Sequence, residues 1–225
     1  MDRAGSPRST SKWGAASLAF ALGLGAVSAW ADDPTSEGGA AGAAKAAGST
    51  VEIIRRNDGH LGAGVQIEPG LILTAAHVVA TERNVLVRDD QGRELIGQVE
   101  EAIAGVDLAF VTVRTPSNMK VSPLSCREPP VGMPIEIVGH PFGREFVVMT
   151  GAVAEGVQRV GEWPSLVILT KNAFPGMSGG PVLGADGRVV AMVVAATDSA
   201  RVARKAGAVP GSVICRNLPG VQASS

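Results

Sequence analysis

Short apolar runs separated by turn residues limit most strongly what this chain of 225 residues can fold into. Each run is long enough for one β-strand, and sequences such as Glu68-Pro69-Gly70 and Ala185-Asp186-Gly187 supply tight turns between runs. A helical period is limited to the segment from Ala75 to Thr81. The pattern predicts an all-β sandwich or barrel with little helix, and two successive groups of six strands fit the number of runs. The runs are residues 51–54, 64–67, 71–74, 85–87, 108–113, 135–138, 146–150, 166–169, 182–183, 189–194 and 212–215.

The N-terminal segment has the pattern of a secretory signal peptide. Cationic residues precede an uncharged apolar run from Trp13 to Val27, and the small-x-small site Ala29-Trp30-Ala31 follows it. A membrane anchor is the alternative, but the run falls short of the ~20 residues that a spanning helix needs. We therefore expect residues 1–31 to be a signal peptide and the mature protein to begin at Asp32. It would be periplasmic or secreted, without stable membrane association after cleavage.

The rest of the chain divides by composition. Residues 32–49 contain mainly Ala, Gly, Ser and acidic residues with almost nothing to bury, which predicts a flexible linker. One folded domain is expected at residues 50–218, and a C-terminal tail at residues 219–225. The formal net charge is −1 and no block of like charges is present, so nothing favours nucleic acid or an anionic membrane as a partner.

The two cysteines, Cys126 and Cys215, are too few and too far apart for a zinc site. The sequence leaves open whether their Cα atoms approach within the limit of about 7 Å for a disulfide. Because the compartment would be oxidising, we predict that the exported protein contains the Cys126–Cys215 bridge. The three histidines share no spacing typical of metal ligands, and no metal site is predicted.

The segment Gly176-Met177-Ser178-Gly179-Gly180 places a serine among glycines. Gly176 can adopt backbone dihedrals that other residues avoid, so its N–H and that of Ser178 can point to one place. Such a pair of N–H groups stabilises the negative charge on an attacked carbonyl, which is acyl-transfer chemistry. A glycine-rich turn that happens to contain a serine is the alternative. We interpret Ser178 as a nucleophile, and the N–H groups of Gly176 and Ser178 as its oxyanion hole.

A serine hydroxyl needs a general base and a group that orients this base. His77 fits the first role, because it follows an apolar strand and small alanines in Thr74-Ala75-Ala76-His77 let the ring sit at the strand end. Asp107 fits the second, because a carboxylate inside an apolar strand must find a partner when it is buried. Asp89 and Asp90 are the rival acids, and we interpret them as solvated residues of a polar turn.

The order of these residues along the chain separates the known hydrolase folds. Gly176-x-Ser178-x-Gly180 also satisfies the nucleophile elbow of another fold, but there a histidine follows the serine, and none does here. The order His77, Asp107, Ser178 is that of chymotrypsin-like double β-barrels. We therefore assign His77 as general base and then acid, Asp107 as the residue that orients it, and Ser178 as nucleophile.

A wider likeness rests on five blocks, namely Gly62 to Val65, Leu73 to Val79, Asp107 to Ala109, Val138 to Gly143 and Phe174 to Pro181. From about residue 51 to 218 the chain resembles the trypsin-like serine peptidases, and it is most similar to the bacterial HtrA/Deg proteases. The resemblance implies two six-stranded antiparallel β-barrels and cleavage of unfolded or misfolded envelope proteins, without a metal or organic cofactor. Polypeptide substrates are the implied partners. A trimer is also implied, although the linker lacks the aromatic residues that would support one.

The chain departs from that family in three places. It ends at Ser225 without room for a PDZ domain, which puts regulation by peptide sensing in doubt. Met177 stands where the family commonly has Asn. A thioether cannot form the ion pair by which a new N-terminus activates the digestive zymogens of this fold, so we expect activation by loop ordering instead. His140 takes a position often held by Asn or Tyr, and we interpret it as a loop residue.

The resemblance also places the primary specificity pocket. Its floor would be Asn172, six residues before the nucleophile, and its wall the strand end Val194-Ala195-Ala196. Neither position holds a carboxylate, so the pocket cannot compensate the desolvation of a substrate Arg or Lys. Ala195 and Ala196 stand where the deepest pockets of the family have glycine, so they should narrow the pocket entrance and exclude Phe or Trp side chains. We expect cleavage after Ala, Val, Ile or Leu, and the direction of the neighbouring Lys171 is left open.

Two other functions are compatible with the same sequence. A catalytically silent binding or chaperone-like module would keep the barrels with the site in an inactive conformation, and it would resist covalent labelling by a fluorophosphonate. An esterase would turn over esters without cleaving protein. The exported serine endopeptidase is the leading hypothesis, because the whole triad is present.

Overall fold

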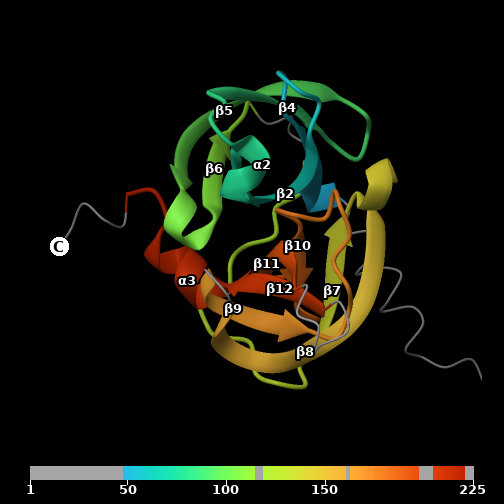
Figure 1. The fold of residues 1–225 in the computed structure, drawn as a ribbon. Helices are drawn as coiled ribbons and strands as arrows, with labels where there is room; N and C mark the ends of the chain where they lie inside the picture. Colours follow the sequence, from blue (N-terminus) through green and yellow to red (C-terminus); the bar gives the residue numbers. More distant parts are fainter. Residues whose placement is uncertain (1–47, 115–118, 161–162, 198–204, 221–225) are drawn as a thin grey trace, which may run out of the picture. The chain divides into compact units, whose positions relative to one another are not determined.

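The computed structural model describes residues 48–114, 119–160, 163–197 and 205–220. Its strands form two closed six-stranded antiparallel barrels, one in the first half of the chain and one in the second (Figure 1). Helix is limited to a few short segments within these ranges. The prediction of an all-β fold with two groups of six strands is confirmed.

The first barrel has the strand order β1-β2-β3-β6-β5-β4, and β1 closes it by pairing with β4. Aliphatic and aromatic side chains that are wholly buried, such as those of Ile53, Leu73 and Phe110, fill its interior. Its elements are β1 (Thr50–Ile54), β2 (Leu61–Glu68), β3 (Leu71–Thr74), α2 (Ala76–Val79), β4 (Asn84–Arg88), β5 (Glu94–Ile103), the 3-10 turn η1 (Ala104–Val106) and β6 (Leu108–Thr112).

The second barrel has the order β10-β11-β12-β9-β8-β7, and β10 closes it by pairing with β7. Buried Val and Leu side chains again fill the interior, together with Met177. Its elements are β7 (Pro134–Gly139), the 3-10 turn η2 (Pro141–Gly143), β8 (Val147–Val160), β9 (Trp163–Leu169), β10 (Pro181–Leu183), β11 (Val189–Thr197), β12 (Lys205–Pro210) and the helix α3 (Gly211–Arg216).

Three elements differ from the sequence prediction. The run 212–215 belongs to α3 and not to a strand, because Val213 and Ile214 bury one helical face in the core. β5 was not predicted, since its exposed and half-exposed polar residues hide any apolar run. β12 was not predicted either, because Lys205 at its start is followed by the small residues Ala206-Gly207-Ala208. The remaining strands overlap predicted runs, although β8 continues ten residues beyond the run 146–150.

The Cys126–Cys215 disulfide is confirmed, with the two Cα atoms 5.6 Å apart. It joins the segment between the two barrels to α3, near the C-terminal end of the described chain. The predicted signal peptide and nearly all of the predicted linker lie outside the described residues, so these domain limits stay predictions. The described ranges contain no helix that combines the length and apolar character needed to cross a membrane.

Candidate active site

The buried carboxylate of Asp107 holds His77 at two points. Oδ2 of Asp107 lies 2.7 Å from Nδ1 of His77, and Oδ1 accepts the backbone N–H of His77 at 2.9 Å. Asp107 is 3% exposed and sits at the end of η1 in a left-handed conformation, with φ at 55°, directly before β6. Because a carboxylate accepts at Nδ1, this nitrogen carries the proton and Nε2 keeps its lone pair. The pair is therefore arranged to make Nε2 a base.

The single helical turn α2 carries His77 directly after β3. The preceding Ala75 and Ala76 are buried, and the N–H of Ala76 donates to the carbonyl of Asp107 at 3.2 Å. A larger side chain at either alanine would push α2 away from β6. The His77 side chain keeps 40% of its surface exposed, so its ring remains accessible to a substrate.

Asp89, a rival acid in the sequence, has a different partner. It is 1% exposed, so its interpretation as a solvated residue is wrong. Nε of Arg93 donates to its Oδ2 at 2.7 Å, and the N–H groups of Gln91 and Arg93 donate to its Oδ1. These contacts close the turn between β4 and β5. Asp90 is exposed, as expected, and Asp107 is the acid that contacts His77.

The residues before Ser178 form a type II turn. Met177 N–H donates to the carbonyl of Phe174 at 3.0 Å, with Pro175 and then Gly176 at the two central positions. Gly176 has φ at 91°, which a type II turn requires at this position and which side chains disfavour. Met177 is wholly buried among the aliphatic side chains of the second barrel. The buried thioether thus anchors the turn from inside the barrel.

Close contacts dock the serine segment onto the first barrel. The carbonyl of Ser178 accepts the N–H of Ala63, in β2, at 2.7 Å. A side chain at Gly179 would collide with the carbonyl of Ala63 and with the hydroxyl of Thr74. Thr74 ends β3, three positions before His77. The two barrels therefore meet where Ser178 and His77 are presented.

The Ser178 hydroxyl contacts the carbonyl of Val194 at 3.5 Å, the limit for a hydrogen bond. No hydrogen bond joins it to His77 within the described residues. Contacts between nucleophile and base are often long without substrate and tighten in the reacting complex. The N–H groups of Gly176 and Ser178 have no acceptor among the described residues, which is what two oxyanion-hole donors require.

The predicted pocket residues lie in the second barrel or in the loop before β10. Asn172 is exposed between β9 and β10, and Val194 is 2% exposed in β11. Ala195 and Ala196 continue β11 and pair with β12, but their side chains lie outside the described part of the structure. The neighbouring Lys171, whose direction the sequence left open, extends over Gly151 of β8.

The sequence missed the contribution of β12. The buried Ala206 donates its N–H to the carbonyl of Lys171 at 2.7 Å, so β12 borders the region of Asn172. The small residues at 206–208 are the signal that could have placed a strand here, because they leave room beside the predicted pocket wall.

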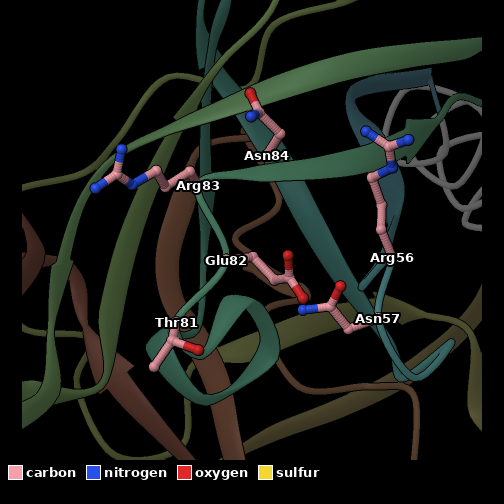
Figure 2. Close-up of a pocket in the computed structure, with 6 residues that line it drawn as sticks. All are labelled: Arg56, Asn57, Thr81, Glu82, Arg83 and Asn84. Atoms are coloured by element: carbon pink, nitrogen blue, oxygen red, sulfur yellow. The ribbon is translucent and has the colours of Figure 1, made fainter.

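A separate open hollow lies on the first barrel, between the β1–β2 connection and the segment after α2 (Figure 2). Its volume is about 550 Å³, and Glu82 and Asn57 face one another at its centre. Small-molecule sites are usually enclosed and largely apolar, unlike this hollow. The residues that line the hollow are Arg56, Asn57, Thr81, Glu82, Arg83 and Asn84.

Within the described ranges, no group of three or more His, Cys, Asp or Glu side chains could hold a metal ion.

The sequence matches the model of the trypsin-like peptidase domain over residues 62–192, which is 58% of the chain. The chain belongs to this family. The matched range includes His77, Asp107 and Ser178, so every residue of the proposed triad lies within it.

The curated relatives that match this trypsin-like chain are DegP- and HtrA-type serine proteases. The DegP-like periplasmic serine endoprotease of Halomonas elongata is 33% identical over 134 residues, which are 58% of this chain. The serine protease HTRA1 of Xenopus laevis is 31% identical over 131 residues, which are 55% of this chain. The match covers 28% of the length of each relative.

Solved structures share the fold. Rv3671c from M. tuberculosis H37Rv, in an inactive form, has a TM-score of 0.68 at 22% identity, with 82% of this chain and 91% of that chain covered. The HtrA-type protease AlgW with a tripeptide has a TM-score of 0.70 at 22% identity, with 79% and 61% covered. These likenesses confirm the expected double barrel of trypsin-like peptidases.

Proposed function

We propose that this trypsin-like chain is an exported serine endopeptidase in which Ser178, His77 and Asp107 form the catalytic triad. The 2.7 Å contact between Nδ1 of His77 and the buried carboxylate of Asp107 is the observation that supports it most directly. The glycine turn around Ser178 and the family of the chain support the same function.

The chemistry follows from the geometry. Nε2 of His77 takes the hydroxyl proton while Ser178 Oγ bonds to the substrate carbonyl carbon, and the N–H groups of Gly176 and Ser178 stabilise the oxyanion. His77 then gives the proton to the leaving amine, and the carbon–nitrogen bond breaks to leave an acyl-enzyme. A water molecule attacks the acyl-enzyme by the same route and regenerates the Ser178 hydroxyl. Asp107 stabilises the imidazolium in both steps.

Substrates are polypeptides, and we place the primary pocket between Asn172 and the β11 segment Val194-Ala195-Ala196. No carboxylate stands at these positions, and the extension of Lys171 over Gly151 supports an uncharged floor. The pocket then accepts small to medium aliphatic side chains. Unfolded or misfolded envelope proteins fit such a site because they expose aliphatic residues, and the proposed signal peptide at residues 1–31 would deliver the enzyme to that compartment.

Digestion of a denatured protein by the purified mature chain, with mass-spectrometric mapping of the cut sites, tests the proposal. Cuts after Ala, Val, Ile or Leu are expected, and they should disappear with Ser178→Ala while the melting temperature stays the same. Cut sites dominated by Arg, Lys or acidic residues would show that the pocket is misplaced. Equal turnover by the Ser178→Ala variant would show that Ser178 is not the nucleophile.

One observation favours a second candidate, a catalytically silent module on the same fold. Ser178 Oγ contacts the Val194 carbonyl and not His77, as it would in a site held inactive. A fluorophosphonate distinguishes the two functions, because it bonds to an activated serine only. Stoichiometric labelling that is lost in His77→Ala supports the peptidase, and an unlabelled wild-type protein supports the silent module.

A further inference from the structure

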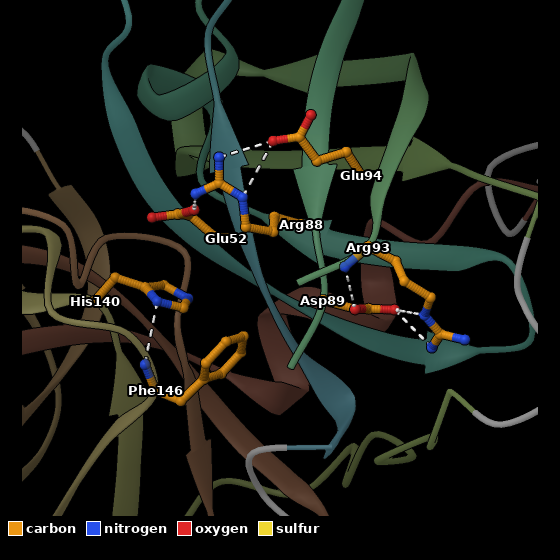
Figure 3. A network of polar contacts seen from close by, with 7 residues as sticks. All are labelled: Glu52, Arg88, Asp89, Arg93, Glu94, His140 and Phe146. Atoms are coloured by element: carbon orange, nitrogen blue, oxygen red, sulfur yellow. Dashed lines mark hydrogen bonds and ion pairs between the residues drawn. The ribbon is translucent and has the colours of Figure 1, made fainter. Parts of the chain in front are cut away.

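His140 is a buried histidine that the proposed triad does not use. It lies between β7 and η2 with no exposed surface. Its Nδ1 accepts the backbone N–H of Phe146 at 3.3 Å, and its ring meets the Phe146 ring edge to face with centroids 4.7 Å apart (Figure 3). The imidazole thus closes the segment 140–146 upon itself.

The backbone of this segment grips the turn that presents the oxyanion-hole donors. His140 N–H donates to the carbonyl of Gly176 at 3.2 Å, and Phe142 N–H donates to that of Pro175 at 2.9 Å. The rings of Phe142 and Phe174 also pack, with centroids 5.6 Å apart. A Cβ at Gly176 would collide with the carbonyl of His140. The segment and the turn are therefore joined by hydrogen bonds, ring packing and a close backbone contact.

Nδ1 can accept the N–H of Phe146 only when it carries no proton. The ring is then neutral, and its single proton is on Nε2. Nε2 is buried and faces the backbone carbonyl of Val51 without forming a well-aligned hydrogen bond to it. Burial lowers the pKa of His140, and Arg88 on β4 lowers it further, whereas the Val51 carbonyl on β1 and Glu145 raise it. Arg88 itself is bound by Glu52 and Glu94. The neutral form thus prevails around neutral pH.

A buried imidazole whose donor finds no well-formed hydrogen bond is costly, and an apolar side chain of similar size would avoid that cost. We infer that His140 is a positioning residue, whose neutral imidazole holds the segment 140–146 against the turn that aims Gly176 N–H at the oxyanion. The inference rests on the proposed function, because it concerns the same site. A second proton would occupy Nδ1, remove the acceptor of Phe146 N–H and release the segment.

Two substitutions separate positioning from packing. His140→Asn keeps an acceptor where Nδ1 lies, whereas His140→Leu keeps most of the volume and has no acceptor. We expect His140→Leu to lower kcat roughly 10–100-fold with KM nearly unchanged, the scale of a misaligned reacting group. His140→Asn should recover most of kcat. It should also remove the ionisation of His140 from the acidic limb of the wild-type kcat profile.

Hydrogen exchange and labelling distinguish a failure of this inference from a failure of the proposed function. In His140→Leu, the amides of 142–146 and 176–178 should exchange faster than in His140→Asn, whether or not the protein cleaves peptides. Wild-type protein that resists a fluorophosphonate would overturn the function. Labelling and exchange at wild-type rates in a folded His140→Leu would overturn the inference. If that variant does not fold, nitrogen NMR of wild-type His140 decides, because a proton on Nδ1 at neutral pH contradicts the inference.

Discussion

At the scale of single residues, the candidate site depends on groups whose freedom is removed by burial. Asp107 is 3% exposed and both of its oxygens contact His77, so the imidazole has one orientation and one tautomer. Asp89 is equally buried but is bound by Arg93. Two buried aspartates of the first barrel therefore have different structural roles. Asp107 orients His77, and Asp89 closes the turn between β4 and β5.

Substitution of each aspartate by asparagine should separate the two roles, because one change should lower kcat and the other the melting temperature. Asp107→Asn should lower kcat by about 10⁴-fold with little change in stability, because the amide favours the wrong imidazole tautomer. Asp89→Asn should leave kcat close to that of wild type and lower the melting temperature, because the ion pair between Asp89 and Arg93 is lost. Steady-state kinetics and thermal unfolding measure both. A larger loss of kcat in Asp89→Asn would refute the assignment of the acid.

Gly176→Ala tests the backbone conformation of the type II turn from Phe174 to Met177, which carries a proposed oxyanion-hole donor. The φ of 91° disfavours any side chain, and the new methyl group would collide with the carbonyl of His140. We expect kcat to fall by roughly 10²–10³-fold, the effect of losing one oxyanion donor. Gly59→Ala is a matched control, because Gly59 also has a positive φ but has open space around it. Similar kcat values for the two variants would contradict the turn's role.

Buried His140 should make the stability of the domain depend on pH. Its pKa is lowered from 6.5 by burial, so below about pH 6.5 the unfolded chain binds a proton that the folded chain resists. The free energy of unfolding should therefore be highest above that pH and decrease as the pH falls toward the folded pKa. Denaturant unfolding of wild type and His140→Asn from pH 7.5 to 5 checks this. The variant should show the smaller decrease.

At the scale of elements, the sequence indicates strands well where apolar residues gather and poorly where packing depends on neighbours. β5 is mostly exposed, yet its Gly97 fits against Val87 and Val111 on adjacent strands, a relation that no local pattern reveals. The run 212–215 has the composition of a strand and forms α3. The contact of His77 with Asp107 was predictable because both residues occur in short, recognisable blocks of sequence. The role of β12 was not predictable, because it depends on contacts between loops that are distant in the sequence.

The register of β1 and β4 places Glu52 directly opposite Arg88, and the two side chains form an ion pair at 2.6 Å. The Glu52 side chain is 4% exposed, and burial raises its pKa. Arg88→Leu should lower the free energy of unfolding by about 2 kcal/mol, less than for a fully buried pair because water screens the 30% exposed Arg88. Denaturant unfolding measures the loss. Addition of Glu52→Gln should recover part of it, since the unpaired charge is then removed.

At the scale of the whole molecule, the proposed site is shared between the barrels. His77 and Asp107 belong to the first barrel and Ser178 to the second, and the hydrogen bond from Ala63 to Ser178 spans the boundary. The segment between the barrels is in turn fixed to α3 by the disulfide. The relative placement of Ser178 and His77 therefore depends on contacts made late in the sequence.

Removal of the disulfide should destabilise this arrangement. Cys126 and Cys215 are separated by 89 positions, and release of so long a loop gives the unfolded chain many more conformations. Cys126→Ala with Cys215→Ala should lower the free energy of unfolding by about 2–5 kcal/mol. Unfolding of the oxidised, reduced and doubly substituted proteins provides the comparison. Equal stability of all three would show that contacts of α3 with the core are sufficient.

The close fit of Gly179 against Ala63 and Thr74 also has a consequence for newly synthesised chains, because it forms only when the two barrels dock. In the proposed triad, a nascent chain that has completed only its first barrel would hold His77 and Asp107 without Ser178. A chain whose barrels have not yet docked would hold all three residues, but apart. The proposed cleavage would then begin only when folding is complete, which would protect newly made copies of the protein from one another.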